Sequence, residues 1–249
     1  MIVKVLLPLP DTDFDVTEVA VPWHILTTAG HRVVFATEHR GTWPAADPLL
    51  LTGVLFGRLG AKPEAKKLYR RLQLSSEFAD TIAWEDIDPI EYDGLLLPGG
   101  HASGVRQYLE STVLQQRIAA FWQLHRPVGA ICHGVVLLAR AIDPGTGHSV
   151  LHDRKTTCLP KYLERTGYFL TAWRRGRYYR TYPAYVEDEV RTALADDSQF
   201  VRGKPVLTRH GTATDHTGAF IVRDRNYLSA RWPGDAYLFA QHFEAMLTA

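Results

Sequence analysis

Continuous apolar runs that alternate with segments of helical periodicity constrain this chain most strongly. Four runs, IVKVLLP, HRVVFAT, YDGLLLPGG and RPVGAIC, are each too apolar for a strand with one face in water. The segment VTEVAVPWHILTTAG between the first two has the pattern of a helix, and Gly30 is a natural stop for it. Buried strands that alternate with helices indicate a parallel sheet covered on both faces. We therefore predict an α/β fold, a three-layer sandwich with a mostly parallel sheet.

The length of 249 residues fits one large α/β domain. Residues 40–80 differ from the rest because Gly and Pro punctuate them around one short amphipathic helix near Glu64–Leu74. We interpret this segment as a lid-like insertion over the strand ends and predict a single domain over residues 1–249.

The second half of the chain contains one irregular stretch and one hairpin pattern. From Pro144 to Pro183 the sequence reads as irregular and includes a basic aromatic patch, WRRGRYYR. Such residues stack on single-stranded nucleic acid, but one short patch in a nearly neutral chain favours a solvated face or a subunit contact. The C-terminal part predicts a hairpin through Arg225–Asn226 and a final amphipathic helix.

Charge and cysteine content exclude several classes of function. Lys and Arg total 28 against 27 Asp and Glu, so no global field recruits nucleic acid or anionic lipid. Two cysteines cannot form a disulfide framework. No apolar stretch approaches the roughly 20 residues of a membrane span, and the N-terminus reads as a strand rather than a signal peptide. We expect a cytoplasmic protein with a small-molecule substrate and neither nucleic acid nor membrane as a partner.

The spacings typical of metal and nucleotide sites are missing from the sequence. The 11 histidines form no His-x₃-His or HExxH pair. His210, Asp215 and His216 in a loop-like stretch are a minor metal candidate. There is no Walker A sequence and no dinucleotide-type glycine fingerprint. We therefore expect neither a metal nor a cofactor.

The segment GAICHGVVLLAR places Cys132 between an apolar run and an apparent helix. Asp11–Asp15, Gly99–His101 and Cys132–His133 all follow the carboxyl ends of predicted strands, where parallel sheets bind ligands. A strand that enters a helix through one reactive residue is typical of a nucleophile elbow, and Gly134 permits the close approach that such a turn needs. The helix N-terminus is expected to lower the pKa of the thiol. These features favour a nucleophile over a packed thiol, whereas Cys158 has no such context and is interpreted as structural.

Three segments together, YDGLLLPGGH, PVGAICHG and TEVAVPWHILTTAGHRVVFAT, resemble the PfpI-type superfamily. This superfamily is related to class I glutamine amidotransferases and includes the Parkinson-associated deglycase and the heat-shock-type glyoxalase III proteins, the branch that the chain resembles most. The resemblance spans residues 1–36, 92–142 and 200–247. It implies a flavodoxin-like, class I glutamine amidotransferase-like domain and a homodimer.

The resemblance also implies roles for individual residues. Glu18 occupies the place of the family's carboxyl that contacts the nucleophile, where it would be neutral beside an ionised Cys132 and would act as general acid or base. The alternative for Glu18 is a helix-start carboxylate that complements the dipole. His133 is the third group, and Glu164 best fits the place of its orienting acid, with Asp153 in reserve. The alternative for Glu164 is a surface helix carboxylate.

The glycine-rich turn before the elbow is the second half of the expected site. Gly99 and Gly100 let backbone N–H groups turn toward a developing oxyanion, together with the N–H of His133. His101 follows these glycines as in the glyoxalase-like branch and is expected to line the pocket. With Gly134, these residues form the expected oxyanion and substrate-binding set.

The implied function is cysteine-dependent, cofactor-independent chemistry on small reactive carbonyls, with methylglyoxal converted to lactate by a glutathione-independent glyoxalase. One alternative is a cysteine hydrolase or hydratase that acts on an amide, a peptide or an isonitrile. Another is a stress-response, chaperone-like protein.

Overall fold

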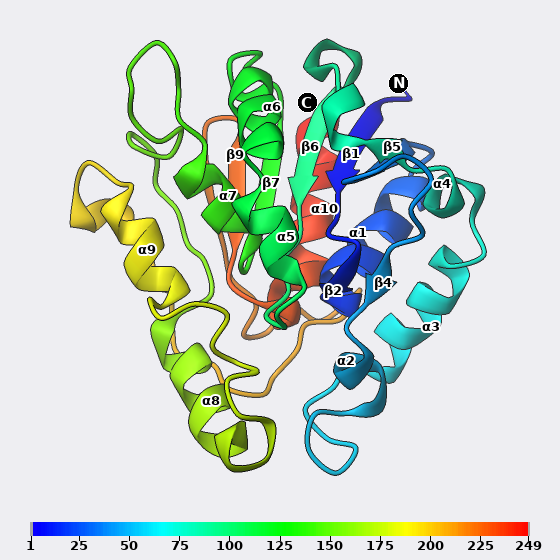
Figure 1. The fold of residues 1–249 in the computed structure, drawn as a ribbon, viewed down its shortest axis with the longest axis vertical. Coiled ribbons are helices and arrows are strands. Elements are labelled where there is room, and N and C mark those ends of the chain that lie inside the picture. The colour runs from blue at the N-terminus through cyan, green and yellow to red at the C-terminus, as the bar shows by residue number, and fades with distance from the viewer. Residues whose placement is uncertain (1, 249) are drawn as a thin grey trace.

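The computed structural model describes residues 2–248 and centres on a seven-stranded sheet (Figure 1). The strands are β1 (Lys4–Pro8), β3 (Arg32–Thr37), β5 (Ile82–Ala83), β6 (Gly94–Leu97), β7 (Val128–Ile131), β8 (Ile221–Asp224) and β9 (Tyr227–Ala230). Their order across the sheet is β5-β3-β1-β6-β7-β9-β8. Every neighbouring pair is parallel except β8 and β9. The mostly parallel sheet predicted from the apolar runs is confirmed.

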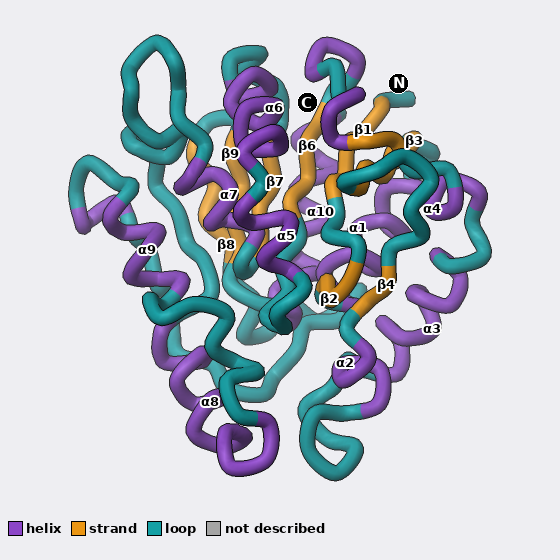
Figure 2. The backbone as a smooth tube through the Cα atoms, viewed as in Figure 1, coloured by secondary structure: helices purple, strands orange, loops and turns teal. Residues whose placement is uncertain are grey.

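Helices cover both faces of this sheet, as Figure 2 shows. One face carries α1 (Val16–Thr28), α3 (Pro63–Leu72) and α10 (Ala236–Leu247), and the other carries α5 (Val105–Glu110), α6 (Thr112–Trp122), α7 (Gly134–Arg140) and α9 (Val186–Thr192). Each side has its own hydrophobic core, with Phe14, Phe35 and Phe78 packed edge to face in the first. This three-layer arrangement is the expected flavodoxin-like fold.

Smaller elements gather near the carboxyl ends of the central strands. They are the parallel pair β2 (Thr12–Phe14) and β4 (Ala45–Ala46), and the helices α2 (Pro48–Thr52), α4 (Ser76–Ala79) and α8 (Lys161–Arg175). Short 3₁₀ turns complete the fold at Trp84–Asp86, Pro89–Glu91, Asp197–Gln199 and Pro233–Asp235. In Figure 1 the arrows of β1 and β6 point toward the end of the molecule where α2 and α8 lie. Ligands bind at this end of a parallel sheet.

The structure corrects the expectation of an irregular stretch from Pro144 to Pro183. Residues 161–175 form α8, a helix of 15 residues. Only Glu164 and Thr171 in this helix are buried. Its large apolar side chains Phe169, Leu170 and Trp173 are exposed, so α8 does not turn an apolar face to the core.

Residues 40–80 contain two different kinds of structure. The helix α3, which matches the predicted one near Glu64–Leu74, buries Leu68, Tyr69 and Leu72 against the layer that contains α1. By contrast, α2 and the loop after it lie toward the carboxyl ends of β1 and β6. Part of the expected lid is therefore an ordinary component of the helical layer.

The C-terminal part agrees with its sequence pattern. The hairpin turns at Arg225, whose φ of +57° lies in the left-handed region, and α10 follows it. Among the described helices, none combines the length and the apolar character needed to cross a membrane.

Candidate active site

Cys132 lies between β7 and α7, and its backbone is unusual. Its φ is +59°, in the left-handed region that residues with a side chain rarely adopt. The next helix begins so close to β6 that a Cβ at Gly134 would lie 2.2 Å from the carbonyl oxygen of Leu97. The strained turn and the tight helix start confirm the predicted nucleophile elbow. They also give Gly134 a packing role rather than a contact with substrate.

Glu18 is brought to the elbow by the first turn of α1. Asp15 caps this helix, because its carboxylate accepts hydrogen bonds from the N–H groups of Thr17 (2.7 Å) and Glu18 (3.1 Å). The Glu18 side chain is fully buried, and its Oε2 accepts a hydrogen bond of 2.8 Å from the N–H of Gly99. Its Oε1 has no hydrogen-bond partner within residues 2–248.

Gly99 is the residue that lets the acid and the nucleophile meet. A Cβ at this position would lie 2.9 Å from Oε2 of Glu18 and 3.0 Å from Cβ of Cys132. A side chain here would therefore push the two groups apart. Since the N–H of Gly99 is already bonded to Glu18, Gly99 positions the acid and does not supply the expected oxyanion contact. Gly100 lines the cavity at Cys132, so its N–H remains a candidate for the oxyanion contact.

His133 faces Cys132 with one ring nitrogen and Thr181 with the other. Its Nδ1 lies 3.5 Å from Sγ of Cys132, and its Nε2 lies 3.1 Å from Oγ1 of Thr181. The Thr181 hydroxyl donates its proton to the carbonyl oxygen of His101 at 2.7 Å. That hydroxyl can only accept from His133, so Nε2 carries the ring proton and Nδ1 is the acceptor toward the thiol. Burial lowers the pKa of His133 to about 3, so the ring is neutral.

Glu164 does not orient His133, contrary to the expectation from the resemblance. Its Oε2 accepts a hydrogen bond of 3.1 Å from the N–H of Val186, and its Oε1 lies 3.8 Å from Nε of Arg180. Asp153, the reserve candidate, has a side chain that is 66% exposed and forms an ion pair with Arg225. The hydroxyl of Thr181, rather than an acid, is the hydrogen-bond partner of Nε2 of His133.

Burial raises the pKa of both groups that meet at Gly99. Burial raises the pKa of Cys132 well above its usual value, and the carboxylates of Glu18 and Asp15 raise it further. The N–H of His133 acts in the opposite direction but does not outweigh burial. Burial raises the pKa of Glu18 as well, and the nearby carboxylate of Asp15 raises it further. Burial therefore favours a thiol at Cys132, the opposite of the expected thiolate, and the raised pKa makes the Glu18 carboxylate a stronger base.

A cavity of about 360 Å³ opens at Cys132. Its wall includes Asp15, Thr17, Gly100, His101 and Glu164 beside many apolar side chains. His101 lines it as expected. Its ring stacks on Tyr179 at 4.4 Å and meets the edge of Tyr178 at 4.6 Å. Burial lowers the pKa of His101 to about 4, so this ring is also neutral.

Sequence reasoning missed the segment that completes the site. Tyr178, Tyr179, Arg180 and Thr181 follow α8 and contact Asp47, His101, Glu164 and His133, respectively. Tyr178, Tyr179 and Arg180 belong to the basic aromatic patch that was interpreted as a solvated face or a subunit contact, and Thr181 follows it directly. Nothing in the local pattern reveals these contacts. Asp15 was detectable, because a capping Asp before a helix at a strand end is a local signal.

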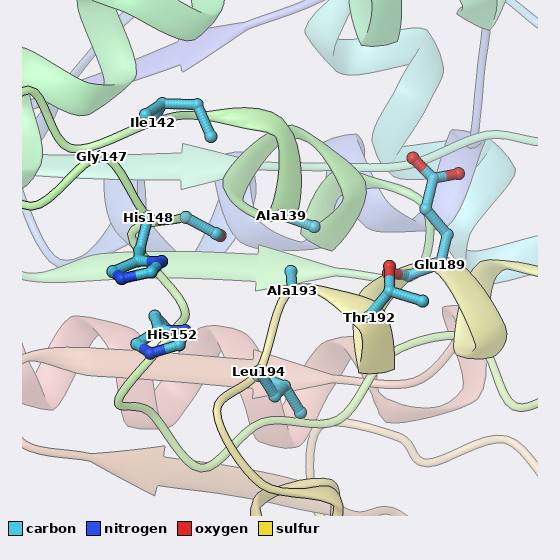
Figure 3. Close-up of a pocket in the computed structure, with 10 residues that line it drawn as sticks. Ala139, Ile142, Gly147, His148, His152, Glu189, Thr192, Ala193 and Leu194 are labelled. Atoms are coloured by element: carbon cyan, nitrogen blue, oxygen red, sulfur yellow. The ribbon is translucent and has the colours of Figure 1, made fainter.

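A second cavity, of about 390 Å³, lies away from Cys132 between the segment 142–152 and α9 (Figure 3). The rings of His148 and His152 stack in it at 4.1 Å. Glu189 on its wall is bonded to Arg140. Within the described chain, no group of three or more His, Cys, Asp or Glu side chains is arranged to hold a metal ion, and this includes the loop with His210 and His216. The second cavity offers no acid, base or nucleophile set comparable to that at Cys132.

The fold and the site define a class of protein, the flavodoxin-like α/β proteins with a cysteine nucleophile elbow. The family model described as ThiJ/PfpI family-like matches residues 9–204, so the chain belongs to the ThiJ/PfpI-like family. This confirms the resemblance to PfpI-type proteins.

Individual relatives agree with this membership. An uncharacterized protein of Schizosaccharomyces pombe is 30% identical over 96% of this chain and 81% of its own length. Deglycase PfpI of Pyrococcus furiosus is 26% identical over 97% of this chain and 98% of its own. The crystal structure of glyoxalase III from Candida albicans superposes with a TM-score of 0.68 at 21% identity, covering 98% of this chain and 97% of that one. This last similarity concerns the fold.

Proposed function

We propose that this protein is a glutathione-independent glyoxalase that converts small 2-oxoaldehydes, of which methylglyoxal is the simplest test, into 2-hydroxy acids. One observation carries the proposal. Gly99 leaves just enough room for the fully buried Glu18 carboxyl to approach the side chain of Cys132, which lines the cavity. A nucleophile and a base in contact are what a proton shift between adjacent carbon atoms requires. Two similar proteins, a deglycase and a glyoxalase III, support reactive carbonyls as the substrate class.

The chemistry begins with addition of the thiol to the aldehyde. Sγ of Cys132 forms a bond to the aldehyde carbon, and its proton passes by way of Nδ1 of His133 to the aldehyde oxygen, which gives a hemithioacetal. The N–H groups of Gly100 and His133 would stabilise the charge that develops on that oxygen. Because Thr181 keeps the proton of His133 on Nε2, the Nδ1 lone pair is available for this transfer.

Glu18 then moves a proton between the two carbon atoms. It removes hydrogen as a proton from the former aldehyde carbon and delivers a proton to the former ketone carbon. The first carbon is oxidised and the second reduced within one molecule, so no external oxidant is needed and a thioester results. Water cleaves the thioester, releases the hydroxy acid and returns the thiol. A carboxylate whose pKa is raised by burial is a stronger base for this step.

The test is formation of D- or L-lactate from methylglyoxal by the purified protein in a buffer without added thiol. The variant Cys132→Ser is expected to form none. Glu18→Gln should also abolish turnover, whereas Glu164→Gln, which keeps the shape of a residue outside the proton path, should retain most of it. If wild-type protein leaves methylglyoxal intact but consumes an amide or an isonitrile, the hydrolase or hydratase alternative replaces this proposal.

A further inference from the structure

We propose that the preferred substrates are uncharged 2-oxoaldehydes whose substituent is apolar and larger than the methyl group of methylglyoxal. This inference rests on the function proposed above and adds a substrate class to it. It is argued from the size of the cavity at Cys132, from its lining and from its rim.

The cavity at Cys132 is far larger than a three-carbon aldehyde needs. Its volume of about 360 Å³ lies within the range of roughly 300–1,000 Å³ that encloses drug-sized ligands. A molecule such as methylglyoxal, once attached to Sγ, would leave most of this space to water. A substituent that fills the space gains the free energy of apolar burial.

Apolar side chains form most of the wall. They come from four separate parts of the chain, which are the α2 region, α8 with the segment just before it, the loop before β8 and the turn after β9. They are Leu50, Leu59, Ala61, Leu159, Leu163, Leu170, Leu207, Trp232 and Pro233. Convergence of four segments on one apolar surface is typical of a ligand pocket rather than of a packing gap.

The apolar surface continues to the outside as a rim. Leu59, Leu170 and Leu207 line the cavity although they are 45%, 55% and 58% exposed. The exposed rings of Phe56, in the loop after α2, and of Trp173, near the end of α8, lie 6.3 Å apart and belong to the same two segments as Leu59 and Leu170. Exposed apolar side chains that gather at one place mark a binding site. Leu59, Leu170 and Leu207 carry the apolar surface of the cavity to the outside.

The loop after α2 and the end of α8 are tied together on this side. Nε of Arg175 donates a hydrogen bond of 2.7 Å to the carbonyl oxygen of Val54. The guanidinium of Arg174 also lies over the ring of Phe56 at 4.5 Å. These contacts hold the rim in place, so the apolar entrance exists before a substrate arrives.

The buried ionisable groups of the wall favour an uncharged substituent. Burial raises the pKa of Glu164 to about 7, and burial lowers the pKa of His210 to about 4. Both shifts favour the neutral forms. Lys62 lines the cavity but is exposed, so its ammonium keeps its hydration. A carboxylate substituent would lose water without gaining a buried cation, and it would meet a second buried acid of the same wall, Asp15.

The test compares kcat/KM of the wild-type protein for methylglyoxal, propylglyoxal, hexylglyoxal and phenylglyoxal. Alkylglyoxals whose alkyl chain ends in a carboxylate serve as the charged substrates. Each methylene that enters the cavity is expected to raise kcat/KM about fourfold, while the carboxylate analogues fall below the uncharged compounds of equal length. A flat or falling series with methylglyoxal still consumed would overturn this inference and leave the proposed function intact. If no compound is consumed, both fail together.

A filling variant locates the effect in the cavity. Ala61→Phe introduces a ring into the wall and should reduce the ratio of kcat/KM for hexylglyoxal over methylglyoxal at least tenfold. The matched control is Ala195→Phe, the same change at an exposed alanine that does not line the cavity, and its ratio should equal that of wild type. An unchanged ratio in Ala61→Phe, with native circular dichroism, would also contradict the inference.

Discussion

The hydroxyl of Thr181 lies 3.1 Å from Nε2 of His133 while it donates to the carbonyl oxygen of His101. This geometry leaves the hydroxyl only as an acceptor toward the ring, so it selects the tautomer of His133. A neutral hydroxyl thus does the orienting that a carboxylate does in a triad. It does so without adding a negative charge to a site that already buries Asp15 and Glu18.

Loss of the Thr181 hydroxyl should lower the rate of the chemical step. We expect Thr181→Val to reduce kcat about tenfold to a hundredfold with little change in KM, because Nδ1 is then no longer kept as the acceptor. Thr181→Ser restores an equivalent hydroxyl and should recover most of kcat. Steady-state kinetics with a 2-oxoaldehyde measures both. If Thr181→Ser is as impaired as Thr181→Val, the tautomer argument is wrong.

Alkylation by iodoacetamide should report the protonation state of Cys132. Because burial and the neighbouring carboxylates raise its pKa, the thiol should react more slowly than free cysteine at pH 7, by about tenfold or more. Glu18→Gln removes the closest of those charges and should accelerate the reaction. The measurement uses a Cys158→Ala background, with mass spectrometry to count modified Cys132. A wild-type rate above that of free cysteine would show that the resting residue is a thiolate.

Glu164 should make the protein less stable as the pH rises. Its pKa is about 7 in the folded chain against an ordinary value of 4.5, so the folded state binds this proton more tightly than the unfolded state. The contribution is fully present below about pH 4.5 and is lost as the pH passes through 7. It amounts to about 3 kcal/mol.

Urea unfolding of wild type and Glu164→Gln at pH 4.5 and pH 8 measures this contribution. The difference in unfolding free energy between the two proteins should shift in favour of the variant at the higher pH, since glutamine does not titrate. Other titrating groups, such as Asp15, cancel in the comparison. A difference that stays constant with pH would refute the raised pKa of Glu164.

Gly134→Ala should destabilise the whole fold. The added methyl group would lie 2.2 Å from the carbonyl oxygen of Leu97 and 2.7 Å from that of Pro98, and neither backbone can move without disturbing β6. We expect a loss of about 3 kcal/mol or more in thermal or urea unfolding. Gly145→Ala is the control, because its nearest contact is the exposed carboxylate of Asp143 at 3.3 Å. Equal stability of the two variants would remove the packing argument for the elbow.

Much of the fold was predictable because its signals are local. A buried strand needs a run of apolar residues, and the elbow needs a strand, one reactive residue and a helix in direct succession, as around Cys132. The meeting of Gly99 and Cys132 also followed, since the carboxyl ends of neighbouring parallel strands lie at one edge of a sheet. The resemblance to PfpI-type proteins added Glu18 to them. The helix α8 was missed because Gly167 interrupts its pattern and the apolar side chains that it carries are not buried in the core.

The sequence alone did not reveal the partner of His133 or the charge state of Cys132, because both depend on tertiary contacts. Thr181 is 48 residues from His133 and reaches it only because the chain returns after α8. The pKa of Cys132 depends on every group that keeps water away from it, and this environment outweighs the helix start that favours a thiolate. Backbone preferences act over a few neighbouring residues, whereas desolvation acts through all the atoms that surround a group. The amino-acid pattern thus specified where the nucleophile stands, and the packing around it determined what holds its proton.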